Sequence, residues 1–144
     1  GVMGELERLV AQKFLTPEQA GSVQTERIVR LFASPFGARI LEAKTLRREF
    51  KFSILVPAAD YYPQAGAEEQ VLLQGVVDCC FETLEGITVV DFKTDRVDRR
   101  SVAARAEEYR PQLAAYSRAL EEITGKPVIR RCLWFFALDQ AVDV

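Results

Sequence analysis

Two stretches of the chain are apolar and rich in β-branched residues over the length of a strand, and together they predict a buried hairpin. They run from Val71 to Phe81 and from Ile87 to Phe92, and this composition is typical of strands. Gly86 lies between them and indicates a tight turn. If Leu84 and Glu85 form the loop, the two strands pair in a defined register outward from it.

Three charged residues lie in or next to this predicted hairpin and suggest its chemistry. The register places Asp78 opposite Asp91, and opposed residues on one face have Cβ atoms roughly 5 Å apart. Lys93 follows Asp91 by two positions, so its side chain points to the same face roughly 7 Å along the strand. Because two adjacent carboxylates repel each other, one of them would take up a proton. A divalent metal ion between them removes this repulsion. Oxygen ligands favour Mg²⁺, for which Mn²⁺ can substitute.

A metal ion held in this way would polarise a phosphoryl oxygen and activate a water molecule. Lys93 would hold that water or stabilise the negative charge that develops on the phosphoryl group. The chemistry that fits these residue types is phosphodiester hydrolysis. The alternative is purely structural, with Asp78 and Asp91 as strand-end residues and Lys93 as their ion-pair partner, because Asp-x-Lys is a short motif with many chance matches.

The remaining hydrophobic pattern predicts helices before the hairpin, and one more helix and strand after it. The predicted helices cover residues 4–13, 16–33, 34–43 and 102–124, and the predicted strands cover residues 46–56, 71–81, 87–92 and 128–138. Thr16-Pro17-Glu18-Gln19 is a capping box, Ser101 is a predicted N-cap, and Pro111 either kinks its helix or begins a new one. We therefore predict an α/β fold with a mixed central β-sheet flanked by helices. It forms one domain, with a helical lead-in at residues 1–45 and a core at residues 46–144.

Four further residues are candidates for the site. Gln112 and Tyr116 are four apart on the predicted last helix and share a face, and Tyr109 precedes Gln112 by three. A tyrosine at this spacing is commonly a core residue, but the neighbouring glutamine keeps a role in the site open. Glu49 lies on the first predicted strand between basic neighbours, either as a surface ion pair or as a further acidic ligand beside Asp78.

Charge and composition limit the kinds of partner. The net charge of −2 and the pI near 5.3 give no bulk attraction for nucleic acid, so any DNA contact must be local. Arg96, Arg99 and Arg100 follow the Asp-x-Lys strand, interleaved with acidic residues, and form either a solvated face or a phosphate-contacting one. No apolar run spans a membrane, no signal peptide opens the chain, and three cysteines build no disulfide framework, so we expect a cytoplasmic protein.

Several of these segments together resemble the RecB-type branch of the PD-(D/E)xK nucleases. The likeness rests on Gly-Val-Val-Asp78, Val-Val-Asp91-Phe-Lys93-Thr-Asp and Gln112-x-x-x-Tyr116. From about Leu31 onward, the chain is similar to the C-terminal nuclease domain of the AddA family of bacterial ATP-dependent helicase/nucleases. The resemblance implies a restriction-endonuclease-like fold in which Asp78 and Asp91 hold Mg²⁺, with Glu49 as the least secure ligand. It also implies that Lys93 positions the attacking water and that Gln112 and Tyr116 lie near the DNA, and Tyr109 is a candidate DNA contact.

The resemblance further implies a larger parent chain. Such a chain carries a UvrD-like helicase motor, works with an AddB-like partner subunit on double-strand breaks, and feeds single-stranded DNA to an exonuclease site for recombinational repair. The family places a histidine on a helix before the strands, and this chain contains none. Two alternatives stay open: a nuclease-fold module with little or no activity, used for DNA binding or subunit docking, and a stand-alone resolvase or restriction-type endonuclease.

Overall fold

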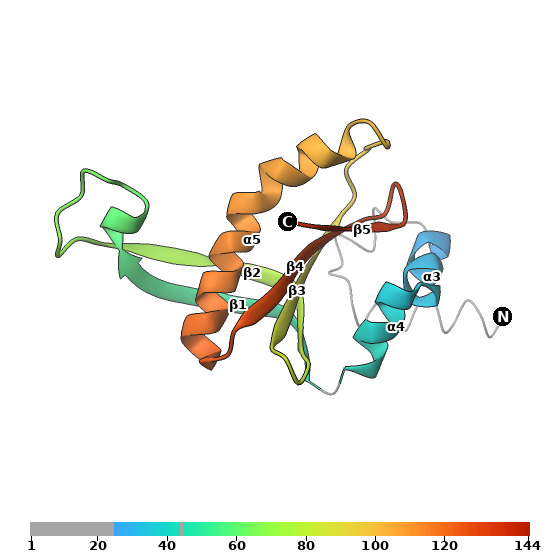
Figure 1. Ribbon diagram of the computed structural model, residues 1–144, viewed down its shortest axis with the longest axis horizontal. Coiled ribbons are helices and arrows are strands. Elements are labelled where there is room, and N and C mark those ends of the chain that lie inside the picture. The colour runs from blue at the N-terminus through green and yellow to red at the C-terminus, as the bar shows by residue number, and fades with distance from the viewer. Residues whose placement is uncertain (1–24, 44) are drawn as a thin grey trace.

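A five-stranded mixed sheet with helices on both faces forms the part of the chain that the computed structural model describes, residues 25–43 and 45–144 (Figure 1). Across the sheet the strands follow chain order: β1 (Leu46–Pro57), β2 (Gln70–Glu82), β3 (Ile87–Lys93), β4 (Val128–Phe135) and β5 (Gln140–Asp143). Neighbouring strands are antiparallel, except that β3 and β4 are parallel. The predicted α/β fold with a mixed sheet is confirmed.

Apolar side chains form one core on each face of the sheet. Helices α3 (Thr25–Ala33) and α4 (Pro35–Glu42) cover the first face, and the long helix α5 (Val102–Thr124) covers the second. The first core includes Leu31, Ile40, Phe81, Val90 and Trp134, and the second includes Val77, Val89, Leu113, Leu120 and Phe135. Successive residues of a strand point to opposite faces, so β3 and β4 contribute to both cores and lie at the centre of the fold.

The β2–β3 hairpin has the register that the sequence predicts. The backbone N–H of Thr83 donates to the carbonyl of Gly86 at 2.8 Å, which closes a two-residue loop of Leu84 and Glu85. Gly86 has a φ of 153°, and a Cβ there would lie 2.5 Å from the carbonyl oxygen of Pro127. Glycine is therefore required at this turn, both for its backbone conformation and for the close approach of the neighbouring segment.

The helices agree with the predictions in part. Ser34 is the N-cap of α4, and its side chain accepts a hydrogen bond from the N–H of Gly37 at 3.1 Å. Helix α5 runs without a break through Pro111. Ser101 occupies the predicted N-cap position of α5, but its side chain does not cap the helix. The predicted helix at residues 4–13 and the capping box at residues 16–19 lie outside the described residues.

The end of the chain differs from the prediction of one strand at residues 128–138. Strand β4 ends at Phe135, a turn follows in which Asp139 has a φ of 49°, and β5 returns antiparallel to β4. The apolar run continues past β4 because Phe136, inside the turn, packs into the core under α3 and α4. The apolar residues at the end of this run are buried or partly buried, but they do not belong to a strand.

A short 3₁₀ helix, η1 (Ala58–Asp60), begins the connection between β1 and β2. The two strands project from the rest of the sheet as a long arm, with this connection at its tip (Figure 1). Arg118 of α5 donates to Asp60 at 2.7 Å and so ties the tip to the helix. None of the described helices has the length and apolar character needed to cross a membrane.

Candidate functional site

Strands β2 and β3 separate at the position of Asp78. Their backbone pairing runs from Glu82 and Ile87 to Cys79 and Val90 and ends there. One step further, the N–H of Phe92 donates to Oδ2 of Asp78 at 3.0 Å, so that a side-chain carboxylate binds a backbone amide of the neighbouring strand. This contact fixes Asp78 beside Asp91, its predicted neighbour in the register.

Strand β1 is irregular at the residue that lies opposite Asp78. Glu49 has a φ of 52°, a left-handed conformation that is uncommon for a residue with a side chain. Leu46 packs against the core under α3 and α4, whereas Phe50 packs against the core under α5. A regular strand would place these two residues on one face, so the strand predicted at residues 46–56 is not a regular one. Glu49 therefore lies across from Asp78, at the position where β2 and β3 separate.

Lys93 lies at the centre of a chain of polar contacts. Its Nζ atom lies 2.7 Å from Oδ2 of Asp91, and it donates to Oε1 of Gln112 at 3.1 Å. The Nε2 atom of Gln112 donates to the hydroxyl of Tyr116 at 2.9 Å. One strand and one helix therefore bring together four of the residues singled out in the sequence, and Asp78 joins them through its contact with Asp91.

Burial and like charge leave the carboxylate pair in conflict. The pKa of Asp91 is raised from 3.8 to about 8, first because the carboxyl is buried and then because it is hydrogen-bonded to Asp78 and close to its charge. Lys93 opposes this rise but does not cancel it. The pKa of Tyr116 is raised to about 12 by burial and by both carboxylates. The surroundings therefore stabilise the negative charge of Asp78 and Asp91 only in part. A divalent cation bound between the two carboxylates would compensate this charge.

Asp78 and Asp91 are suitable ligands for a hard cation such as Mg²⁺ or Mn²⁺. Such ions take oxygen ligands, and Mg²⁺ usually keeps several waters and binds through one or two carboxylates. Among residues 25–43 and 45–144, the structure contains no cluster of three or more His, Cys, Asp or Glu side chains arranged to hold a metal. Glu49 is therefore not brought into a cluster with the two aspartates, and its role as a ligand stays a prediction.

Asp95 is a site residue that the sequence reasoning missed. Its Oδ2 atom accepts a hydrogen bond from the hydroxyl of Tyr109 at 2.7 Å and from Arg105 at 3.0 Å. The ring of Tyr109 lies under Lys93, with Nζ 3.8 Å from the ring centroid. The predicted DNA contact of Tyr109 is untested, and its hydroxyl group is hydrogen-bonded to Asp95. The position of Asp95, two residues after Lys93, was the available signal.

The arginines that follow β3 divide into two groups. Arg105 and Arg110 pair with acidic neighbours, with Arg105 bound to Asp95 and Arg110 lying 2.7 Å from Glu107. Arg96, Arg99 and Arg100 are exposed, and within the described part of the chain the structure records no ion pair for them. These three stay predicted phosphate contacts.

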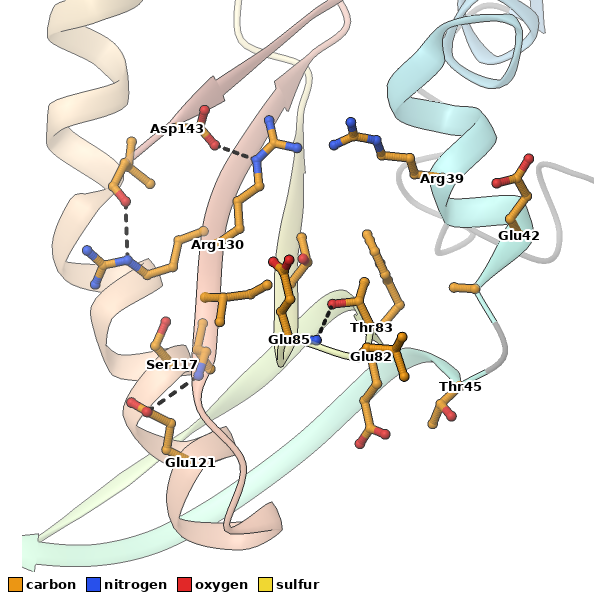
Figure 2. Close-up of a pocket in the computed structure, with 18 residues that line it drawn as sticks. Arg39, Glu42, Thr45, Glu82, Thr83, Glu85, Ser117, Glu121, Arg130 and Asp143 are labelled. Atoms are coloured by element: carbon orange, nitrogen blue, oxygen red, sulfur yellow. Dashed lines mark hydrogen bonds and ion pairs between the residues drawn. The ribbon is translucent and has the colours of Figure 1, made fainter.

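A pocket of about 1400 Å³ lies near the loop of the β2–β3 hairpin, and none of the predicted site residues lines it (Figure 2). Its polar lining includes Glu82 and Glu85 of the hairpin, Arg39 of α4, and Arg130, which donates to Asp143 at 2.7 Å. Asp91 and Lys93 lie at the other end of β3. The pocket is therefore separate from the carboxylate and lysine cluster.

Comparison with known proteins shows which family the chain is similar to. Residues 2–142 match the model of the PD-(D/E)XK nuclease superfamily. The chain is 42% identical over 139 residues to an ATP-dependent helicase/nuclease subunit from Acetivibrio thermocellus, covering 94% of this chain and 11% of that protein. It is 41% identical over 145 residues to the protein of the same name from Carboxydothermus hydrogenoformans, covering 100% and 12%. For the Bacillus cytotoxicus protein the identity is 38% over 152 residues, covering 99% and 12%.

Proposed function

Because the chain belongs to the PD-(D/E)XK nuclease superfamily, we propose that it hydrolyses phosphodiester bonds of DNA in a Mg²⁺-dependent reaction at the open end of the β2–β3 hairpin. The observation that carries this proposal is the contact of Lys93 with both Asp91 of β3 and Gln112 of α5. An ion pair needed only for stability would require no third partner from another element. A lysine held from two elements beside a pair of carboxylates has the arrangement of a site that binds and orients a reacting group.

Asp78 and Asp91 would hold the metal ion through their carboxylate oxygens. When bound, Mg²⁺ supplies Lewis-acid polarisation of a phosphoryl oxygen and lowers the pKa of a coordinated water. Binding requires Asp91 to lose its proton, so the raised pKa of this residue links metal binding to pH.

Lys93 orients the attacking water or stabilises the charge that develops on the phosphoryl group. An ammonium group has three N–H donors, and two of them face oxygens of Asp91 and Gln112. A water molecule or a phosphoryl oxygen would take its hydrogen bond from the same ammonium group. Because Gln112 also donates to Tyr116, its amide is oriented with the oxygen toward the lysine, and this places an acceptor beside the ammonium group.

We extend the proposal to an exonuclease that takes single-stranded DNA ends within a larger assembly. The similar proteins are named helicase/nuclease subunits, and this chain spans 11–12% of their length. A helicase motor elsewhere in such a protein would supply single strands, and an AddB-like partner subunit would share the processing of double-strand breaks. The exposed Arg96, Arg99 and Arg100 follow directly after the site and would contact the phosphates of the strand.

A cleavage assay tests the proposal. The purified chain is incubated with 5′-labelled single-stranded DNA and Mg²⁺, and a parallel sample contains excess EDTA. We expect short labelled products with the metal and none with the chelator. No cleavage with Mg²⁺ or Mn²⁺ would favour the second candidate, a nuclease-fold module without activity of its own. The observation behind that candidate is that only two carboxylates come together in the described residues.

A further inference from the structure

Tyr109 places the face of its ring against the ammonium group of Lys93. The Nζ atom lies 3.8 Å from the ring centroid, inside the range in which a cation is attracted to the electrons of an aromatic ring. The side chain of Lys93 is 14% exposed, so little water competes with the ring. Since a lysine side chain has four rotatable bonds, a ring at this place removes much of the freedom of its end.

The ring is itself held in place. The hydroxyl of Tyr109 donates to Oδ2 of Asp95 at 2.7 Å, and Arg105 donates to the same oxygen at 3.0 Å. The side chain of Asp95 is 15% exposed. A carboxylate that accepts from two donors on the first turns of α5 has a fixed orientation, and it fixes the plane of the tyrosine ring in turn.

Three contacts therefore surround the ammonium group, and they come from two elements. Asp91 of β3 approaches with a carboxylate oxygen, Gln112 of α5 with an amide oxygen, and Tyr109 of α5 with a ring face. Tyr109 and Gln112 are three residues apart, which places both on one side of α5. The two oxygens alone would leave the lysine free to turn away from them, toward the position that the ring occupies.

We propose that Tyr109, anchored by Asp95, is a positioning residue that aims the Lys93 ammonium group at the reacting water or phosphoryl oxygen. The inference rests on the proposed nuclease function and adds two residues to it. It assigns Tyr109 a role inside the protein, in place of the DNA contact expected from the sequence.

The test compares Tyr109→Leu with Tyr109→Phe. Loss of the ring in Tyr109→Leu is expected to lower kcat for cleavage of labelled DNA about tenfold, with KM and Mn²⁺ affinity unchanged. Tyr109→Phe keeps the ring but loses its hydrogen bond to Asp95, so its kcat should lie between those of the wild type and of Tyr109→Leu. Tyr62→Leu, which removes a tyrosine that is 62% exposed at the arm tip, is the matched control. Melting curves establish that each variant is folded.

A second readout does not depend on activity. The chain has five lysines, so the ¹³Cε–¹Hε signals of labelled lysine can be assigned with Lys93→Arg. Ring currents above an aromatic face move nearby protons upfield, so the ε-protons of Lys93 should lie upfield of those of the other lysines. The shift should persist in Tyr109→Phe and vanish in Tyr109→Leu.

The outcomes separate this inference from the proposed function. Loss of the shift together with the fall in kcat supports the positioning role. A shift that survives in Tyr109→Leu, or a kcat that stays unchanged when the shift is lost, overturns it. If the wild-type chain cuts no DNA while the shift is present, the proposed function fails, and the measured contact of Tyr109 with Lys93 still stands.

Discussion

The Nζ atom of Lys93 lies 2.7 Å from Oδ2 of Asp91, and the side chains of the two residues are 14% and 4% exposed. Salt screens such a buried pair far less than a surface pair. Gln112 of α5 accepts a hydrogen bond from the same ammonium group, so Lys93 is held by contacts with both the sheet and the helix. Its place is set by tertiary structure, and substitutions at Lys93 and at its partners should therefore have separable effects.

Replacing Lys93 with alanine should abolish cleavage. The change removes the donor that orients the water or stabilises the phosphoryl charge, and loss of one such donor lowers a rate by roughly 100-fold or more. The measurement is the initial rate on 5′-labelled single-stranded DNA, together with circular dichroism and a melting curve. Lys51→Ala, an exposed lysine on β1, is the control and should cut normally. Cleavage by folded Lys93→Ala at the wild-type rate would rule out the role given to the lysine.

Replacing Gln112 with leucine should lower kcat about tenfold. The variant loses the acceptor for Lys93 and the donor to Tyr116, and removal of a hydrogen bond to a charged group is worth about 1.5–3 kcal/mol. Metal affinity should stay the same, because the two carboxylates are untouched. Steady-state kinetics and a Mn²⁺ titration check both statements. Gln74→Leu, an exposed glutamine on β2, serves as the control, and equal effects of the two substitutions would contradict the prediction.

Metal-free protein should become less stable as the pH rises toward 9. The pKa of Asp91 is about 8 in the folded protein against 3.8 in a free side chain, so the folded state holds this proton more tightly than the unfolded state. Protonation of Asp91 therefore favours the folded state. Its contribution to the free energy of unfolding is complete below about pH 4 and is lost as the pH rises to and through 8. Urea unfolding in EDTA at pH 5.5 and pH 9 measures the change.

The variant Asp91→Asn isolates this effect, because an amide does not titrate. Its stability should fall less than that of the wild type between the two pH values. Glu85→Gln, at the exposed loop of the hairpin, should behave like the wild type. Parallel losses in the wild type and Asp91→Asn would show that another group is responsible.

Replacing Gly86 with alanine should destabilise the fold by more than about 1 kcal/mol. The φ of 153° strains any other residue by about 1–3 kcal/mol, and the new Cβ would lie 2.5 Å from the carbonyl oxygen of Pro127. Gly66→Ala is the control, because the nearest heavy atoms to its Cβ would lie at least 3.7 Å away. Denaturant unfolding of the two variants should differ clearly, and equal stabilities would contradict the account of this turn.

Local pattern was sufficient to predict the hairpin and part of the site. A two-residue loop at Leu84 and Glu85 fixes the register of β2 and β3, and from that register the neighbouring positions of Asp78 and Asp91 follow without any tertiary information. Helical spacing likewise placed Gln112 and Tyr116 on one face, where they are hydrogen-bonded. The family is confirmed by comparison, and the α/β fold with a mixed sheet by the topology.

What the sequence could not predict depends on contacts between distant segments. The left-handed conformation of Glu49 leaves no mark in the sequence pattern of β1, although Leu46 before it and Phe50 after it pack into different cores. The ring of Tyr109 under Lys93 depends on how α5 crosses the sheet. Strand β5 was missed because the turn before it contains the buried Phe136, so no polar break marks the end of β4.

Titration of Mn²⁺ in a calorimeter, with cleavage of 5′-labelled single-stranded DNA followed in the same samples, tests the central claim most directly. The wild-type chain should bind the metal and cut the DNA, and Asp91→Asn should lose both, since Asp78 and Asp91 are the ligands that we assign. Metal binding without cleavage by the wild type would mean that the carboxylate site is real but not sufficient. Neither binding nor cleavage by the folded wild-type chain would contradict the assignment of the hairpin as a metal-dependent nuclease site.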